Sequence, residues 1–243
     1  MALVTGGNGG IGRAIALTLA KAGADVAIIG RNEAKTAAVV AEIVERGRRA
    51  VGLTCDVTDR AAIRTTVEQV VQHLGSVTIL VNNAGIVRPG SPLKKAPEEW
   101  DQVLSTNLDA PFFFAQAVYP AMAAAGGGSI INISSISSVV GQSYNADYNA
   151  AKAGLDGLTR SLAVAWAKKG IRVNSLLPGW VLTEMTESAA ADPAWLAAQV
   201  ARIPLGRFAG PEEMTGAVLF LASSASSYMT GASLVIDGGL TVG

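Results

Sequence analysis

The sequence has little cysteine, histidine or charge and no long hydrophobic run, and each shortage excludes a class of protein. Its 243 residues include one cysteine, Cys55, which excludes an intramolecular disulfide, and one histidine, His73. Because a cluster of histidine and cysteine ligands needs several such residues, we expect no bound metal. No stretch approaches the roughly 18 continuous apolar residues of a membrane span, and no secretory signal pattern is present. We therefore expect a cytoplasmic protein with no membrane partner.

Charged residues are scarce and balanced. They make up 16% of the chain, against about 25% in ordinary soluble domains, and 19 basic side chains offset 19 acidic ones. A chain without net charge lacks the overall positive charge that attracts nucleic acid, so we expect no nucleic-acid partner. Half of the residues are hydrophobic, which excludes a disordered chain. No charged residue occurs from Ala110 to Ala146, which predicts a segment buried in the fold or covered by another subunit.

Short β-rich runs alternate with longer helical patterns along most of the chain. We expect strands at residues 2–5, 25–29, 51–54, 77–81, 129–133, 171–177 and 233–236, and helices at 11–22, 33–46, 60–73, from about 98, at 147–168, 194–201 and 212–222. Apolar strands without alternation, separated by helices, indicate a parallel sheet covered on both faces. The sequence therefore predicts an α/β protein, a single doubly wound Rossmann-type domain over residues 1–243 with a seven-stranded parallel sheet.

A glycine-rich segment from Thr5 to Gly12 joins the first expected strand to the first expected helix. Glycines at this place let the backbone turn tightly and approach a pyrophosphate, whose charge lies at the helix N-terminus. The spacing of Gly7, Gly9 and Gly12 also satisfies the dinucleotide-binding fingerprint. We therefore expect a dinucleotide cofactor.

The end of the second expected strand bears on which cofactor is bound. An acidic residue there binds the ribose hydroxyl of NAD, whereas a nearby arginine suits the 2′-phosphate of NADP. Here Gly30 occupies the expected acidic position, Arg31 follows it, and Asp25 lies at the opposite end of the strand. This pattern favours NADP over NAD. The alternative is that Arg31 is simply a solvent-exposed residue at the start of the next helix.

Tyr148 and Lys152 lie one helical turn apart and therefore on one helix face. A neighbouring cation favours the phenolate form of a tyrosine. Tyr148 is thus a candidate for exchanging a proton with an alcohol or carbonyl oxygen near neutral pH.

Further motifs follow in order along the chain. They are Asp56-Val57, Asn82-Asn83-Ala84-Gly85, Asn107 within Thr106-Asn107-Leu108, Asn132-Ile133-Ser134-Ser135 ahead of Tyr148 and Lys152, and Pro178-Gly179 with Val181 and Thr183. With the glycine loop, this order and spacing resemble the single-domain form of the short-chain dehydrogenase/reductase family over nearly the whole chain. The resemblance implies an NAD(P)-dependent oxidoreductase that acts on CH–OH and C=O groups.

The resemblance also implies which residues serve the cofactor and the reaction. The cofactor residues would be Gly6, Asn8, Gly10, Ile11, Gly12, Arg31, Asp56, Val57, Asn83, Ala84, Gly85, Tyr148, Lys152, Pro178, Gly179, Val181 and Thr183. Tyr148 would be the general acid in reduction and the general base in oxidation. Lys152 would lower the pKa of Tyr148 and bind the nicotinamide ribose. Ser135 would donate a hydrogen bond to the substrate oxygen. Asn107, which falls where the family has a helix-interrupting asparagine, would hold a water that connects Lys152 to a proton relay.

The substrate is less clearly indicated. Residues that resemble pocket positions are Gln142 and Trp180, which join Ser135 and Tyr148 as expected substrate contacts. Gln142 suits a hydroxylated or acidic substrate and Trp180 an apolar one. A mobile segment around residues 183–207 is expected to close over the substrate as a lid.

Three functions remain open at this point. The stretch from Arg202 to Phe208, continued by Asp237-Gly238-Gly239, looks like that of sugar-acid dehydrogenases acting on gluconate derivatives and also like that of 3-oxoacyl carrier-protein reductases. The reductases usually carry two basic residues for docking the carrier protein, where this chain has Lys169 and Ser129. A non-catalytic dinucleotide-binding sensor would usually have lost Tyr148 or Lys152, and both are present.

The uncharged run and the resemblance together predict an assembly. In the family, the helices that contain the counterparts of Asn107 and Tyr148 pack against a neighbouring subunit. The C-terminal segment, here near residues 238–243, joins a second interface. We therefore expect a homotetramer with two-fold axes.

Overall fold

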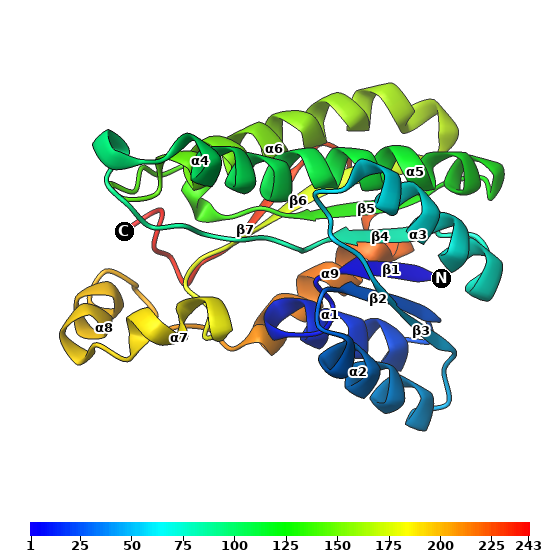
Figure 1. The fold of residues 1–243 in the computed structure, drawn as a ribbon, viewed down its shortest axis with the longest axis horizontal. Helices are drawn as coiled ribbons and strands as arrows, with labels where there is room; N and C mark the ends of the chain where they lie inside the picture. The colour runs from blue at the N-terminus through cyan, green and yellow to red at the C-terminus, as the bar shows by residue number, and fades with distance from the viewer.

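The computed structural model describes residues 1–243. One sheet of seven strands runs through it in the order β3-β2-β1-β4-β5-β6-β7 (Figure 1). The strands are β1 (Ala2–Thr5), β2 (Val26–Gly30), β3 (Ala50–Thr54), β4 (Ile79–Asn82), β5 (Gly128–Ile133), β6 (Ile171–Pro178) and β7 (Ser233–Ile236). Every neighbouring pair is parallel, which confirms the expected fold class.

Helices cover both faces of this sheet (Figure 1). One layer contains α1 (Gly10–Lys21), α2 (Glu33–Glu45) and α9 (Thr215–Ala222); the other contains α3 (Arg60–Leu74), α4 (Pro97–Leu104), α5 (Ala110–Ala124) and α6 (Ala146–Trp166). Two short helices, α7 (Glu184–Ala190) and α8 (Pro193–Val200), extend away from both layers. None of the helices is long and apolar enough to cross a membrane.

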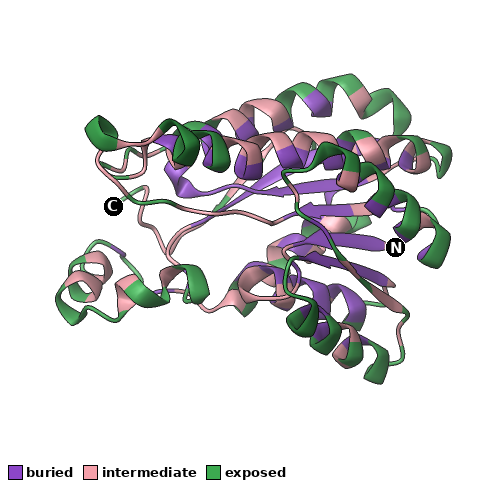
Figure 2. Ribbon diagram, in the orientation of Figure 1, coloured by how far each residue is buried: buried purple, intermediate pink, exposed green.

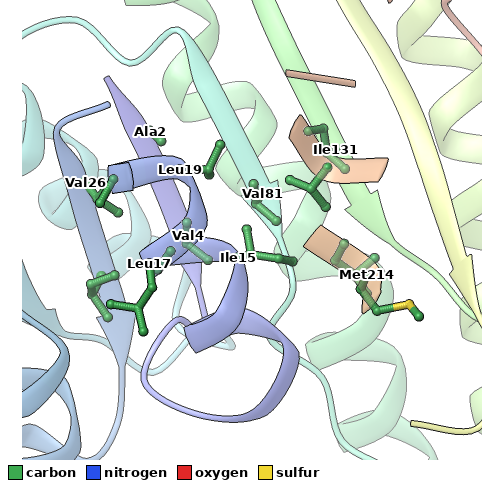
Figure 3. Packing of buried hydrophobic residues seen from close by; sticks show 14 of the residues in the cluster. Ala2, Val4, Ile15, Leu17, Leu19, Val26, Val81, Ile131 and Met214 are labelled. Carbon is green, nitrogen blue, oxygen red and sulfur yellow. The ribbon is translucent and has the colours of Figure 1, made fainter. Parts of the chain in front are cut away.

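Successive residues of each strand alternate between two hydrophobic cores, because side chains along a strand point to opposite faces. In β1, Ala2 and Val4 pack toward α1 with Ile15 and Val26, as Figure 3 shows, while Leu3 packs on the other face. The central strands are therefore buried on both sides, as the purple colour in Figure 2 shows. This double burial explains why the strands are apolar without alternation.

Several expected element boundaries differ from the structure. The single helix expected from residue 98 is two helices, α4 and α5, separated by a π-helical turn at Ser105–Asp109. The helix expected at 212–222 begins with a 3₁₀ turn, Pro211–Met214, and α7 was not expected at all. Other boundaries move by a residue or two, as helix and strand ends commonly do.

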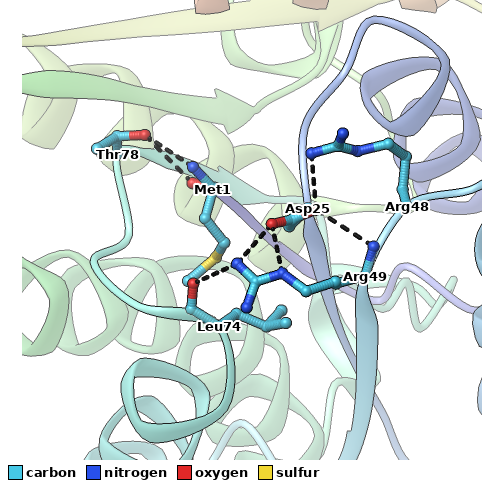
Figure 4. Close-up of polar contacts among 6 residues, drawn as sticks. All are labelled: Met1, Asp25, Arg48, Arg49, Leu74 and Thr78. Atoms are coloured by element: carbon cyan, nitrogen blue, oxygen red, sulfur yellow. Dashed lines mark hydrogen bonds and ion pairs between the residues drawn. The ribbon is translucent and has the colours of Figure 1, made fainter.

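The amino ends of the strands are held by a cluster of charges far from their carboxyl ends (Figure 4). Asp25 pairs with Arg48 at 2.8 Å and with Arg49 at 2.7 Å, and the hydrogen bond from Arg49 is the main cause of a lowered Asp25 pKa. Asp25 therefore lies at the amino ends of the strands, too far to contact a cofactor bound at their carboxyl ends, as expected.

Candidate active site

A large cavity lies at the carboxyl ends of the strands. It has a volume of about 1190 Å³ and is lined by loops that follow β1, β2, β3, β4, β5 and β6, together with α7 and α8. The strand order reverses between β1 and β4, since β1 leads to β2 on one side while β4 continues on the other. In open parallel sheets, such a switch point is where ligands bind.

The glycine loop between β1 and α1 is shaped for close approach of a ligand. Gly6 has φ of 62° and Gly10 has φ of 47°, a conformation that other residues rarely adopt. A Cβ atom on Gly12 would lie 2.2 Å from the Gly6 carbonyl oxygen, so only glycine allows α1 to start here. The first N–H groups of α1 have no acceptor within the helix. The cradle therefore fits a diphosphate.

Asn83 ties this loop to the strand on the other side of the switch point. Its amide nitrogen Nδ2 donates to the carbonyls of Thr5 at 3.0 Å and Gly6 at 3.1 Å. The hydroxyl of Thr5 in turn accepts hydrogen bonds from the backbone N–H groups of Asn83 and Ala84, both at 3.0 Å. The loop is thus held rigidly against the end of β4.

At the end of β2, the space beside Gly30 is filled by Asn8. A Cβ atom on Gly30 would lie 2.2 Å from Asn8 Nδ2. That nitrogen donates to Asn32 O at 3.3 Å and to Thr36 Oγ1 at 3.0 Å, so the amide is held in place. Arg31 follows, exposed and without an ion-pair partner, and lines the cavity.

Asp56 and Val57 line the same end of the cavity after β3. The Asp56 carboxylate accepts hydrogen bonds from Thr58 N at 2.9 Å and Thr58 Oγ1 at 2.8 Å. The backbone hydrogen bond from Thr58 is the main cause that lowers the Asp56 pKa, so this carboxylate is ionised at neutral pH.

Tyr148, Lys152 and Ser135 meet in the middle of the cavity. Lys152 is 4% exposed, and its Nζ donates to the Ile133 carbonyl at 2.8 Å and lies 5.5 Å from the centre of the Tyr148 ring. Ser135 Oγ accepts from the Ser137 N–H at 3.1 Å, which fixes the hydroxyl at the end of β5. Strand β5 and helix α6 therefore bring the predicted trio together.

The pKa values here are governed by burial. Desolvation raises the pKa of Tyr148, opposed by a hydrogen bond from Ser135. Desolvation also lowers the pKa of Lys152 to about 8, although the carboxylate of Asp156 raises it. The sequence led us to expect that Lys152 would favour the Tyr148 phenolate. In the structure the pKa of Tyr148 is raised instead, because desolvation is its largest influence and the opposing influence is the hydrogen bond from Ser135.

Asn107 lies in the π-helical turn that separates α4 from α5 and is fully buried. Its Oδ1 accepts from Ile86 N at 3.1 Å, and its Nδ2 donates to Ile86 O at 2.8 Å and Val103 O at 3.0 Å. A π-turn inside a helix often accompanies a functional site. Here it turns the Asn107 amide toward the segment after β4.

Below the trio, a buried polar network joins β4, β5, β6 and α6. Asn82 Nδ2 donates to Asn132 Oδ1 at 2.8 Å, and Asn132 Nδ2 donates to Thr159 Oγ1 at 2.8 Å. Thr159 Oγ1 and Ser175 Oγ are also 2.8 Å apart. Asn82 Oδ1 has no partner, but the hydrogen bonds that are formed connect these four elements within the protein interior. The network thus holds α6 in register with the strand ends.

Most of the residues implied by the family motifs line this one cavity. They are Gly6, Asn8, Gly10, Ile11, Arg31, Asp56, Val57, Asn83, Ala84, Gly85, Ser135, Gln142, Tyr148, Lys152, Pro178, Gly179, Trp180, Val181 and Thr183. Gly12 and Asn107 do not line it. Gly12 instead packs α1 against Gly6. Asn107 lies behind the cavity lining and hydrogen-bonds to Ile86, which does line the cavity.

The cavity lining also contains residues that the motifs did not indicate. They include Asp101 and Gln102 of α4, Trp195 and Gln199 of α8, and Arg202. Trp195 packs edge-on against Trp180, with ring centres 5.2 Å apart, and Trp180 stacks on Phe208 at 5.5 Å. Arg202 donates to Gln199 Oε1 at 3.4 Å and forms no ion pair. No local signal identifies these residues, although Arg202 begins the stretch that resembles sugar-acid dehydrogenases.

Comparisons with known proteins agree with this geometry. A family model described as enoyl-(acyl carrier protein) reductase matches residues 6–241. Gluconate 5-dehydrogenase of Gluconobacter oxydans is 39% identical, covering 99% of this chain and 94% of its own, and 3-oxoacyl-[acyl-carrier-protein] reductase of Escherichia coli is 41% identical, covering 99% and 96%. A crystal structure of a gluconate 5-dehydrogenase from Burkholderia cenocepacia, in complex with NADP and tartrate, is 38% identical with a TM-score of 0.96, covering 100% and 95%.

These relatives are dehydrogenases and reductases that share the fold over almost their whole length. Together with the glycine cradle and the meeting of Ser135, Tyr148 and Lys152 in one cavity, they define the reaction class. It is transfer of a hydride between a nicotinamide cofactor and an alcohol or ketone. The chain belongs to the short-chain dehydrogenase/reductase family.

Proposed function

We propose that the protein interconverts a hydroxyl and a keto group on a sugar acid and uses NADP in preference to NAD. The observation that carries this proposal is the cavity itself. One end contains Arg31 and Asp56 but no acidic residue at Gly30, and the lining also includes Arg202, which forms no ion pair and lies beside polar side chains.

The catalytic roles follow from the positions of the trio. The bound nicotinamide supplies or accepts the hydride. Tyr148 gives a proton to the carbonyl oxygen in reduction and takes it back in oxidation, while Ser135 donates a hydrogen bond to the same oxygen. Lys152 binds the cofactor ribose and, once the site is filled, favours the phenolate. Asn107 orients the segment at Ile86 and is the proposed anchor of the proton relay.

The preference for NADP is supported at the end of β2. An acidic side chain at residue 30 would collide with the held amide of Asn8, so the usual carboxylate for the NAD ribose does not fit. Arg31 forms no ion pair and lines the cavity at this end, although it is close enough to Asp56 to help lower the pKa of that carboxyl. A guanidinium binds phosphate through two parallel hydrogen bonds. Arg31 is therefore our proposed 2′-phosphate contact.

The proposal of an acid substrate is supported by the additional lining residues described above. Arg202 is a cation without a carboxylate partner there, and Asp101, Gln102, Gln142 and Gln199 offer hydrogen bonds to several hydroxyl groups. The Burkholderia relative holds tartrate, itself a hydroxy acid. A polyhydroxylated chain ending in a carboxylate matches this arrangement, with Gln142 and Trp180 as further contacts.

The test is a substrate panel with matched acid and neutral members. We expect reduction of 5-ketogluconate, with a higher kcat/KM for NADPH than for NADH. Arg202→Gln should raise KM for 5-ketogluconate by about 10- to 100-fold, since a charge-assisted hydrogen bond contributes about 1.5–3 kcal/mol. The KM for a neutral ketose such as fructose should not change.

Three results would contradict this proposal. Equal turnover of acid and neutral substrates would remove the carboxylate argument, and faster turnover with NADH would remove the Arg31 argument. Absence of turnover with any ketone or alcohol would favour a cofactor sensor.

A 3-oxoacyl carrier-protein reductase is the second candidate, because a 41% identical relative has that name. Docking of an acidic carrier protein requires exposed basic residues, and the positions that resemble the docking pair are Lys169 and Ser129. Lys169 is exposed, but Ser129 is 2% exposed and donates to Leu221 O at 2.8 Å. Turnover of an acetoacetyl thioester at a higher kcat/KM than 5-ketogluconate would favour this candidate.

We further propose that residues 183–207 act as a lid and that the protein is a homotetramer. Glu184 at the start of α7 pairs with Lys35 of α2 at 2.7 Å, across the mouth of the cavity. Apolar side chains are exposed on α6, where Val164 is 82% exposed, and along the other edge at Phe220, Tyr228 and Val235. Such surfaces are typical of subunit interfaces. A sedimentation mass of 24.8 kDa at micromolar concentration would contradict the tetramer.

A further inference from the structure

A buried ion pair lies directly beside Tyr148 and has no role in the chemistry described above. Lys95 Nζ is 3.0 Å from Asp147 Oδ2, and the two side chains are 6% and 0% exposed. Asp147 immediately precedes Tyr148 in the first turn of α6, and Lys95 follows the 3₁₀ turn Pro92–Lys94. Neither side chain lines the cavity, so neither contacts the substrate directly.

Each member of the pair is also bound to the backbone of an active-site segment. Lys95 Nζ donates to the carbonyl of Arg88, and the same Nζ lies 3.9 Å from Oε2 of Glu99 in α4. Asp147 Oδ1 accepts from the Tyr148 N–H at 2.9 Å, while its Oδ2 has no hydrogen-bond donor besides the Lys95 ion pair.

A second contact joins the same two segments. The Gly90 N–H donates to the carbonyl of Tyr144 at 2.8 Å. The segment from Ile86 to Lys95 is thus tied to the start of α6 at two places. Of this segment, Ile86, Val87 and Pro89 line the cavity.

A contribution to folding stability does not by itself explain why two charged side chains are buried here. Burying two charges costs several kcal/mol each, and apolar side chains of similar size commonly fill the same space without loss of stability. Apolar side chains lack direction, however, whereas this pair fixes the Arg88 carbonyl and the Tyr148 N–H relative to each other. Its particular contribution is therefore orientation.

We propose that Lys95 and Asp147 are positioning residues, which set the distance between the Tyr148 hydroxyl and the wall formed by Ile86 to Pro89. The substrate lies between these two surfaces, so the pair controls how closely its carbonyl approaches the proton donor. The inference rests on the proposed role of Tyr148 as general acid. A displacement of about 1 Å in such a site costs up to about a hundredfold in rate.

The experiment compares Lys95→Met, Asp147→Asn and the double variant with the wild type, using any ketone that the wild type reduces with NADPH. We expect each single variant to unfold at a lower temperature. Lys95→Met leaves the buried Asp147 carboxylate without a partner, and Asp147→Asn leaves Lys95 with only the more distant Glu99. Each should also lose about 10- to 100-fold in kcat, with an unchanged Kd for NADPH. The double variant should recover the unfolding temperature but keep the low kcat.

The double variant decides between orientation and simple packing. If it recovers kcat together with the unfolding temperature, the pair only fills space and the proposal is overturned. Single variants with kcat within twofold of the wild type would also overturn it. Arg49→Met is the matched control, since it removes a partner of Asp25 at the opposite edge of the sheet (Figure 4) and should leave kcat unchanged.

Failure of the proposal is distinguishable from failure of the Tyr148 assignment. Tyr148→Phe, measured in the same assay, gives the rate without a proton donor. If Tyr148→Phe retained wild-type turnover, the general-acid role would be wrong whatever the pair does.

Discussion

Replacing Tyr148 with phenylalanine is expected to lower kcat by about 10²- to 10⁴-fold, the usual contribution of a positioned general acid. The change removes one oxygen atom and keeps the ring that packs beside Lys152, so the fold should be retained. Turnover is measured from the absorbance of the reduced cofactor, and NADPH binding by fluorescence titration. Binding should persist at close to its wild-type affinity.

Tyr228→Phe provides the matched control, because it deletes the same atom from a fully exposed side chain outside the cavity. Its kcat should equal that of the wild type. Retention of more than a tenth of wild-type turnover by Tyr148→Phe would rule out the phenol as the proton donor.

Lys152→Met is expected to have a comparably large effect on turnover and a separate effect on stability. Turnover should fall by at least about 10²-fold if Lys152 favours the Tyr148 phenolate as proposed above. Burial lowers the Lys152 pKa from 10.5 to about 8 in the folded chain. Between these two values the unfolded chain still holds the proton that the folded chain has released, so the free energy of unfolding rises with pH.

This contribution to stability is fully present above the unfolded pKa and is lost as the pH falls through the folded value. It amounts to about 3 kcal/mol at most, since each pKa unit corresponds to about 1.4 kcal/mol. Urea unfolding at pH 7.5 and pH 10 measures it. The wild type should gain stability relative to Lys152→Met over this interval, while Lys168→Met, at an exposed lysine, should follow the wild type. A constant difference between Lys152→Met and the wild type would contradict the prediction.

The sheet could be predicted from the sequence because its signal is local. Runs such as Val26–Gly30 and Ile171–Pro178 are apolar throughout, and they recur with helices between them. The glycine loop has a local signal as well, since Gly12 permits contacts that no other residue allows. The apolar pattern alone predicted one continuous helix here, and only the resemblance, which places a helix-interrupting asparagine at Asn107, pointed to the π-helical turn.

The site was only partly predictable, for a physical reason. Tyr148 and Lys152 lie on one helix, so their spacing along the chain shows that they are neighbours. Arg202 and Asp101 line the same cavity only because α4 and the end of α8 both border it in the folded chain. The Lys95–Asp147 pair similarly depends on tertiary packing, which brings together segments about fifty positions apart.

Residues 182–208 form a loop whose two ends lie side by side just beyond β6. Val181 pairs with Ala209 in a parallel bridge, with Leu182 N donating to Ala209 O and Ala209 N donating to Trp180 O, both at 2.9 Å. The two ends of the segment 182–208 are thus held side by side by backbone hydrogen bonds, which do not depend on the side chains of the residues between them. We therefore expect substitutions in the intervening stretch to change the wall of the cavity while leaving the sheet and the trio of Ser135, Tyr148 and Lys152 in place.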